Sequence, residues 1–144
     1  MTMTEATSKL RNFIKDHEAL NVILEREENT NAELEDFIVD ALDEINNLYP
    51  PKTSWTLDNI SSWNLLKYGA VLQLLTSNGI LSARNTYNYS DGFGVNISDQ
   101  DYWGRYINYY NVLINKYLTM VTNYKRAANI ESCYGGLSSD YWNL

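Results

Sequence analysis

The fold of this chain is decided by residues 58–98, which read DNISSWNLLKYGAVLQLLTSNGILSARNTYNYSDGFGVNIS. Up to about residue 85 the stretch is apolar on almost every side for about six turns, which predicts a central buried helix capped by Asp58 or Ser61. Beyond it, large residues alternate with small polar ones, which is the period of β-strands, and Asp91-Gly92 between them favours a tight turn. The stretch therefore predicts a buried helix followed by a β-hairpin at residues 86–98.

Helical patterns flank this stretch on both sides. Residues 4–20 carry one apolar stripe, and a second helix is expected from Thr30, which has capping-box spacing with Glu33, to just before Pro50. A fourth helix is expected from Ser98 to about Ala128. The predicted fold class is mainly α, a four-helix bundle-like domain with one β-hairpin inserted between the third and fourth helices and an extended C-terminal arm. We expect the helical domain to span 1–128, with the hairpin at 86–98, and the arm to span 129–144.

Charge is distributed unevenly along the chain. The 144 residues have a net charge of −7, and residues 1–48 hold twelve acidic and four basic residues, a net of −8, so residues 49–144 carry +1. This polarity permits head-to-tail contact between copies, although an ordinary solvated acidic helix face is the simpler explanation. An acidic chain without clustered Lys and Arg is a poor match for direct nucleic-acid binding. No signal peptide or membrane-spanning run is apparent, and the single cysteine, Cys133, excludes an internal disulfide and fits a reducing compartment.

No catalytic residues, metal ligands or cofactor-binding motif stand out. The acidic face of the second helix, with Asp36, Asp40 and Asp43, has carboxylates at cation-binding spacing, but only His17 lies among possible partners. These residues are the one candidate site for the alternative of a small enzyme or regulatory domain. We expect instead a solvated helix face, no cofactor and no enzymatic activity.

The most unusual features are aromatic. The fourth helix carries a tyrosine-rich stripe, and buried tyrosine hydroxyls need partners, which favours half-wet places such as subunit interfaces. The tail contains Gly135-Gly136 followed by large apolar residues, which suits docking into a partner, although a tail folded back on its own domain remains an alternative.

Several short motifs in order resemble the small head–tail connector proteins of tailed bacteriophages, which form adaptor or neck rings. These motifs are Asn46-Asn47-Leu48-Tyr49-Pro50-Pro51, Leu65-Leu66-Lys67-Tyr68-Gly69-Ala70, Ala83-Arg84-Asn85, Tyr89-Ser90-Asp91-Gly92, Asn129-Ile130-Glu131, Tyr134-Gly135-Gly136 and Ser139-Asp140-Tyr141. They span most of the chain from about residue 21, whereas the first twenty residues match no such pattern.

The resemblance implies a virion structural protein that forms a ring, dodecameric in the virion, at the head–tail junction and connects the portal to the tail. It implies that the protein is made in the host cytoplasm, contacts the portal and adjacent neck or tail proteins, touches no membrane, and lets DNA pass without sequence-specific binding. The implied partner-binding residues are Tyr134, Leu137, Tyr141 and Trp142 in the arm and Phe93 in the hairpin. The alternative is another phage structural component, such as a tail-completion or tail-hub protein.

Overall fold

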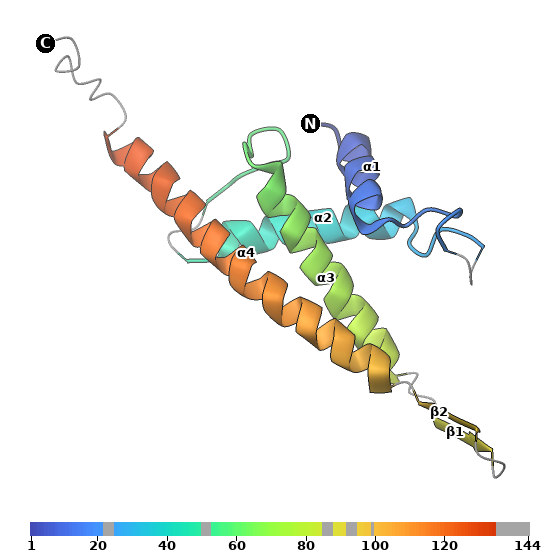
Figure 1. The fold of residues 1–144 in the computed structure, drawn as a ribbon. Coiled ribbons are helices and arrows are strands. Elements are labelled where there is room, and N and C mark those ends of the chain that lie inside the picture. Colours follow the sequence, from blue (N-terminus) through green and yellow to red (C-terminus); the bar gives the residue numbers. More distant parts are fainter. Residues whose placement is uncertain (22–24, 50–52, 85–87, 92–94, 99, 135–144) are drawn as a thin grey trace, which may run out of the picture.

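The computed structural model describes residues 1–21, 25–49, 53–84, 88–91, 95–98 and 100–134. Within them lie α1 (Met3–Ile14), α2 (Asn31–Asn47), α3 (Trp63–Arg84), β1 (Asn88–Asp91), β2 (Val95–Ser98) and α4 (Gln100–Tyr134). α2 lies across α3, and α1 packs against the beginning of α2 (Figure 1). α4 starts at the hairpin and runs back beside α3 (Figure 1). The C-terminal part of α4 continues away from α3 to the opposite end of the molecule (Figure 1).

The predicted fold class is wrong as a description of this architecture. The described helices do not line up as one bundle, because α2 crosses α3 and the long α4 packs mainly on α3 (Figure 1). The two strands, β1 and β2, are four residues each and pair with each other, from Asn88 opposite Ser98 to Asp91 opposite Val95. They lie beyond the ends of α3 and α4 and are not part of the helical body (Figure 1). The fold is therefore a set of crossing helices, and α4 stays helical to Tyr134 where the sequence predicted an extended arm from residue 129.

The hydrophobic core lies where α1, α2, α3 and the middle of α4 meet. Its buried members are Ala6, Leu10, Leu34, Ile38, Ala41, Ile45, Leu65, Leu66, Ala70, Val71, Leu72, Leu74, Tyr117 and Val121. The three-and-four spacing of the α2 set is the spacing that predicted this helix. Among the described residues of α4, Tyr117 and Val121 are the fully buried core members, and Tyr110, Leu113, Ile114, Met120 and Tyr124 pack against the core around them.

The predicted start and end of α2 are confirmed, but other helix ends differ. Thr30 and Glu33 form the capping box, each side chain accepting a hydrogen bond from the other residue's backbone amide. Thr2 and Glu5 form a second capping box at the start of α1, and the spacing Thr-x-x-Glu would have predicted it. α3 begins only at Trp63, so neither Asp58 nor Ser61 directly precedes it as the predicted N-cap residue.

In the segment between α2 and α3, Trp55 packs against the core. The Asn46 side chain fastens it by accepting from the Trp55 amide at 2.9 Å and the Thr53 hydroxyl at 2.8 Å. The buried Lys125 ammonium donates to the carbonyl oxygens of Asn46 at 3.1 Å and Leu48 at 2.6 Å. The end of α2 is thus satisfied by a lysine from α4, as helix C-termini favour cations.

Gly69 allows α2 and α4 to approach α3 closely. A Cβ at this position would lie 3.0 Å from the Ala41 Cβ and 3.1 Å from the Tyr117 hydroxyl oxygen, whereas a Cβ at Gly104 would meet nothing within 4 Å. We expect Gly69→Val to lower the free energy of unfolding by about 1–3 kcal/mol through overpacking. The matched change Gly104→Ala should raise it by up to about 1 kcal/mol, because alanine favours a helix over glycine. Urea unfolding of both variants measures the difference, and equal effects would contradict the close approach.

Candidate assembly surface

The residues that sequence reasoning selected for partner binding are not placed by the structure. Phe93, Leu137, Tyr141 and Trp142 lie outside the described residues. Tyr134 is the last residue of α4, and its side chain is likewise outside the described part. Their role in docking stays a prediction, and a candidate surface has to be built from other side chains.

The end of α3 is not enclosed as its apolar sequence predicted. Ile80 is 57% exposed and Leu81 is 56% exposed, although both belong to the run that predicted a helix wrapped on all sides. The prediction holds for the first half of α3, where Leu65, Leu66 and Ala70 are buried. The last turns of α3 extend past α1 and α2, and α4 is the described helix that continues beside them (Figure 1).

An apolar groove lies between this exposed part of α3 and the first described turns of α4. It has a volume of about 290 Å³ and is lined by Leu75, Thr76, Gly79, Ile80, Tyr106, Ile107 and Tyr110. We call it the α3–α4 groove. Gly79 lines the groove without contributing a side chain to its wall. Grooves of this size and composition hold a few large apolar side chains of a ligand or partner.

A polar pocket adjoins the α3–α4 groove. Its volume is about 240 Å³, and it shares Leu75 and Tyr106 with the groove. The other walls are the end of α1, the loop that follows it and the middle of α3, with polar groups from Lys15, Asp16, Asn21, Glu28, Asn29 and Asn78. The two hollows together offer an apolar site beside hydrogen-bonding groups.

Tyr106 stands between the two hollows. Burial raises the pKa of its hydroxyl above the ordinary value, and the charge of Glu28 acts in the same direction, while a hydrogen bond with Asn78 opposes both. The hydroxyl is therefore neutral at the boundary between the two hollows. A neutral phenol in such a place can both donate and accept a hydrogen bond to a partner.

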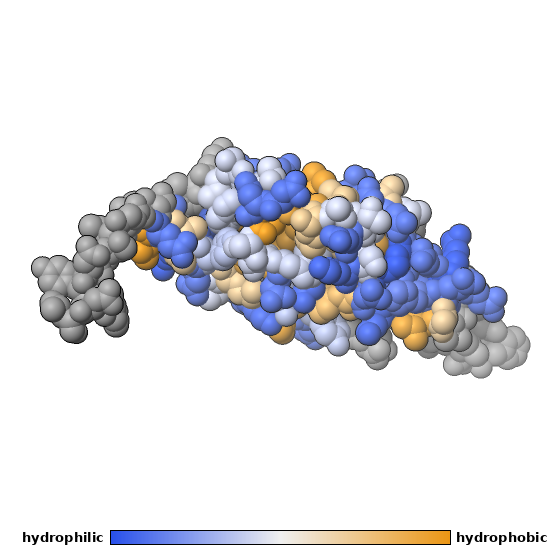
Figure 2. Space-filling model, turned by 90° about the horizontal axis from the view of Figure 1, so that it is seen from above, coloured by the Kyte–Doolittle hydropathy of each residue, from blue (hydrophilic) through white to orange (hydrophobic). Residues whose placement is uncertain are grey.

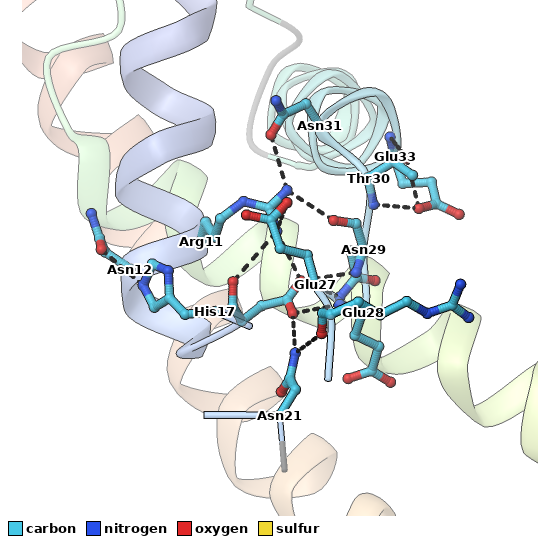
Figure 3. Close-up of polar contacts among 12 residues, drawn as sticks. Arg11, Asn12, His17, Asn21, Glu27, Glu28, Asn29, Thr30, Asn31 and Glu33 are labelled. Atoms are coloured by element: carbon cyan, nitrogen blue, oxygen red, sulfur yellow. Dashed lines mark hydrogen bonds and ion pairs between the residues drawn. The ribbon is translucent and has the colours of Figure 1, made fainter. Parts of the chain in front are cut away.

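The wall formed by the loop is held by a buried polar network. Arg11 donates from Nη2 to the Asn29 carbonyl oxygen at 2.8 Å and to Asn31 Oδ1 at 2.9 Å (Figure 3). Its Nη1 lies 3.1 Å from Asp16 Oδ2 and 3.1 Å from Glu27 Oε2. One arginine on α1 thus fastens both the loop and the start of α2.

Asp16 is the acceptor at the centre of this network. It accepts from the backbone amides of Glu28 at 2.7 Å and Asn29 at 2.9 Å, and from the side-chain amides of Asn21 and Asn29. Burial alone would raise the pKa of Asp16, but the hydrogen bonds from these amides outweigh it and hold the pKa below its ordinary value.

This network explains why α1 is shorter than the sequence predicted. The helix was expected over 4–20 but ends at Ile14, because Lys15 takes a left-handed conformation with a φ of 62° and turns Asp16 back toward the loop. His17, the only histidine, lies with Nε2 3.0 Å from Asn12 Oδ1 (Figure 3). His17 follows the end of α1, and its carbonyl oxygen accepts from the Leu20 amide in the turn that begins there.

The acidic residues of α2 that formed the alternative candidate site face the solvent. Asp36, Asp40 and Asp43 are exposed. Glu44 differs from them, because it accepts from Gln73 Nε2 at 3.0 Å and faces the Tyr117 hydroxyl at 3.5 Å. Among the residues that the structure describes, no three histidine, cysteine or acidic side chains are grouped as metal ligands.

The molecule's other uncovered apolar residues are more scattered. Seen from above, the surface is largely hydrophilic, with hydrophobic residues exposed in small patches, including next to the undescribed segments at both ends (Figure 2). On α4 the exposed ones are Ile107, Tyr109, Val112, Leu118 and Ile130. The tyrosine-rich stripe of this helix is therefore divided, with Tyr117 in the core and Tyr109 in solvent.

Comparison with known proteins adds no relative. No protein-family model, no curated protein and no solved structure matches this chain. In the described part of the chain, none of the helices has the length and apolar character needed to cross a bilayer.

Sequence reasoning missed the α3–α4 groove and the polar network beside it. Ile80 and Leu81 were assigned to the core because an apolar run does not show where the neighbouring helices stop. The sequence did place Gly79-Ile80 before the predicted hairpin and Tyr106-Ile107 after it, and these two pairs meet in the groove. The network joins residues 18 and 20 positions apart, Arg11 with Asn29 and Asn31, so no local pattern marks it.

Proposed function

We propose that this protein is a structural component of a tailed-bacteriophage virion, which forms a ring at the head–tail junction and connects the portal to the tail. The resemblance described above supports this role through motifs spread along the chain. The single structural observation that supports assembly is the α3–α4 groove, an apolar hollow left open at one end of an acidic molecule.

The arrangement suits assembly better than catalysis. The groove is lined by aliphatic and tyrosine side chains, which bind by burial and carry no acid–base pair. The buried charged groups, Arg11, Asp16 and Lys125, all bond to the protein's own backbone. These charged groups stabilise the fold. The groove offers a partner an apolar surface for burial.

We expect deletion of residues 135–144 to leave the domain folded and to abolish its incorporation into the ring. The described core ends at Val121, and the last described tertiary hydrogen bonds come from Lys125, so the deletion removes no described core contact. The measurement has two parts, thermal unfolding of the shortened chain and reconstruction of virions assembled with it.

The control for this deletion is Asp36→Ala, an exposed change on α2 that should affect neither unfolding nor incorporation. Normal incorporation of the shortened chain would contradict an assembly role for the arm. Finding the labelled full chain away from the neck would favour a tail-completion or tail-hub protein instead.

A further inference from the structure

The α3–α4 groove is an apolar surface that needs an apolar occupant, and the chain itself contains a fitting segment. Residues 135–144 read GGLSSDYWNL, with Leu137, Tyr141, Trp142 and Leu144 as large apolar side chains and no basic residue. We propose that the groove of one copy binds residues 135–144 of a neighbouring copy, with Tyr141-Trp142 as the anchors. This inference rests on the proposed function, because it specifies how identical subunits of the ring would be joined.

The length of the segment keeps its anchors away from the interior of its own groove. From Tyr110, the groove residue on α4 closest to the C-terminus, to Tyr134 the helix rises about 36 Å at about 1.5 Å per residue. The segment would have to reverse direction at Gly135-Gly136, and its eight residues up to Trp142 span at most about 28 Å when fully extended. The Trp142 Cα therefore stops roughly 8 Å short of the Tyr110 Cα, so even a fully extended segment could bring its anchor only to the near edge of its own groove and not between Ile80 and Ile107.

The chemistry of the groove fits such an anchor pair. The apolar walls from Leu75, Ile80 and Ile107 offer burial to a tryptophan ring, and tryptophan and tyrosine are the side chains that most often dominate an interface. The Trp142 indole and the Tyr141 hydroxyl each need a hydrogen-bond partner when buried. The Tyr106 hydroxyl and the adjoining polar pocket supply such partners at the edge of the groove.

The positions of the groove and of residues 135–144 determine how the copies would be arranged. The groove lies at the hairpin end of α4, and the segment begins at the opposite end of the same helix (Figure 1). Each copy then gives its segment to one neighbour and receives another in its groove. Such a head-to-tail contact produces a closed ring when the rotation between copies closes. The resemblance directs the arm to the portal, whereas the groove gives it a partner in the ring itself.

The test is disulfide formation between two separately purified full chains, both carrying Cys133→Ser so that no native thiol remains. One carries Ile80→Cys in the groove, and the other carries Asn143→Cys beside the anchors and a mass tag. They are mixed with no portal present, at about millimolar concentration, and oxidised mildly. We expect a covalent dimer that contains one chain of each kind.

The matched control replaces Ile80→Cys by Thr119→Cys, an exposed position on α4 about 18 Å along the helix from Ile107. A second control adds Ile107→Asp to the Ile80→Cys chain, which should lower the dimer yield about tenfold, because the anchors would bury a carboxylate. Ile107 is exposed, so this change should not alter the thermal unfolding of the chain.

A dimer yield no greater than that of the Thr119→Cys control would overturn the proposal. So would an intrachain disulfide in a single chain carrying both Ile80→Cys and Asn143→Cys, because it would show that the segment reaches its own groove. Failure of the disulfide together with normal incorporation at the neck would leave the proposed function standing. A specific disulfide in a protein found away from the neck would support this contact while contradicting the head–tail position.

Discussion

Asp16→Ala should lower the free energy of unfolding by about 3–4 kcal/mol, since it removes one partner of a buried ion pair and leaves buried donors unpaired. Arg11 would lose its buried counter-charge, and the amides of Glu28 and Asn29 would lose their acceptor. Urea unfolding at neutral pH measures the loss. The matched control is Asp36→Ala, because Asp36 is exposed on α2 and its removal should change stability by less than about 0.5 kcal/mol.

The same carboxylate should make this loss depend on pH. The pKa of Asp16 is lowered in the folded state, so its contribution is fully present above the ordinary unfolded pKa of about 4 and is lost as the pH falls through the folded pKa. The difference in stability between the wild type and Asp16→Ala should therefore narrow in acid below about pH 4. A difference that stays constant from neutral pH to about pH 2 would contradict the hydrogen-bonded state of Asp16.

This network also bears on the candidate site. Asp16 and Asn29 line the polar pocket beside the α3–α4 groove, and Arg11 fixes the loop that carries them. Asp16→Ala is therefore expected both to lower the free energy of unfolding and to change the wall of the polar pocket. The disulfide test of the groove uses Ile80 and Ile107, which take no part in this network, so the two experiments report on different parts of the surface.

The extent to which sequence predicted this structure depends on the range of the interactions involved. α2 was predicted well, because its apolar spacing, its capping box at Thr30 and the Pro50 that follows it all act within a few residues. The arrangement of the helices was predicted wrongly, because it depends on where α2 crosses α3, and this crossing decides whether α4 completes a bundle. The early end of α1 depends on Asp16 meeting Glu28 and Asn29, contacts that no local periodicity encodes.

The same reasoning explains what could be inferred about the site. Sequence reasoning identified aromatic residues in the arm by their type, and it could not identify the surface that would receive them. That surface arises where α3 and α4 continue together beyond the other helices, which is a property of the packing. The exposed Ile80 and Leu81 show that one apolar run can include both core residues and exposed residues.

Tyr117→Ala should be the most damaging change in α4, with an expected loss of about 3–5 kcal/mol in the free energy of unfolding. Tyr117 is 1% exposed and is one of two residues of this helix in the buried core, the other being Val121. Its ring fills the space left by Gly69, and its hydroxyl faces Glu44 of α2 at 3.5 Å. Burial, with the charge of Glu44 in addition, raises the pKa of this hydroxyl, so it stays neutral there.

The control for this change is Tyr117→Phe, which keeps the ring and removes only the hydroxyl, at an expected cost of about 1 kcal/mol. Urea unfolding separates the two variants, and amide exchange along α4 shows whether the helix detaches locally. A loss for Tyr117→Ala no larger than that for Tyr117→Phe would mean that the ring contributes little. In that case α4 would be held mainly by Val121, by its half-buried neighbours in the core and by the bonds of Lys125 to Asn46 and Leu48.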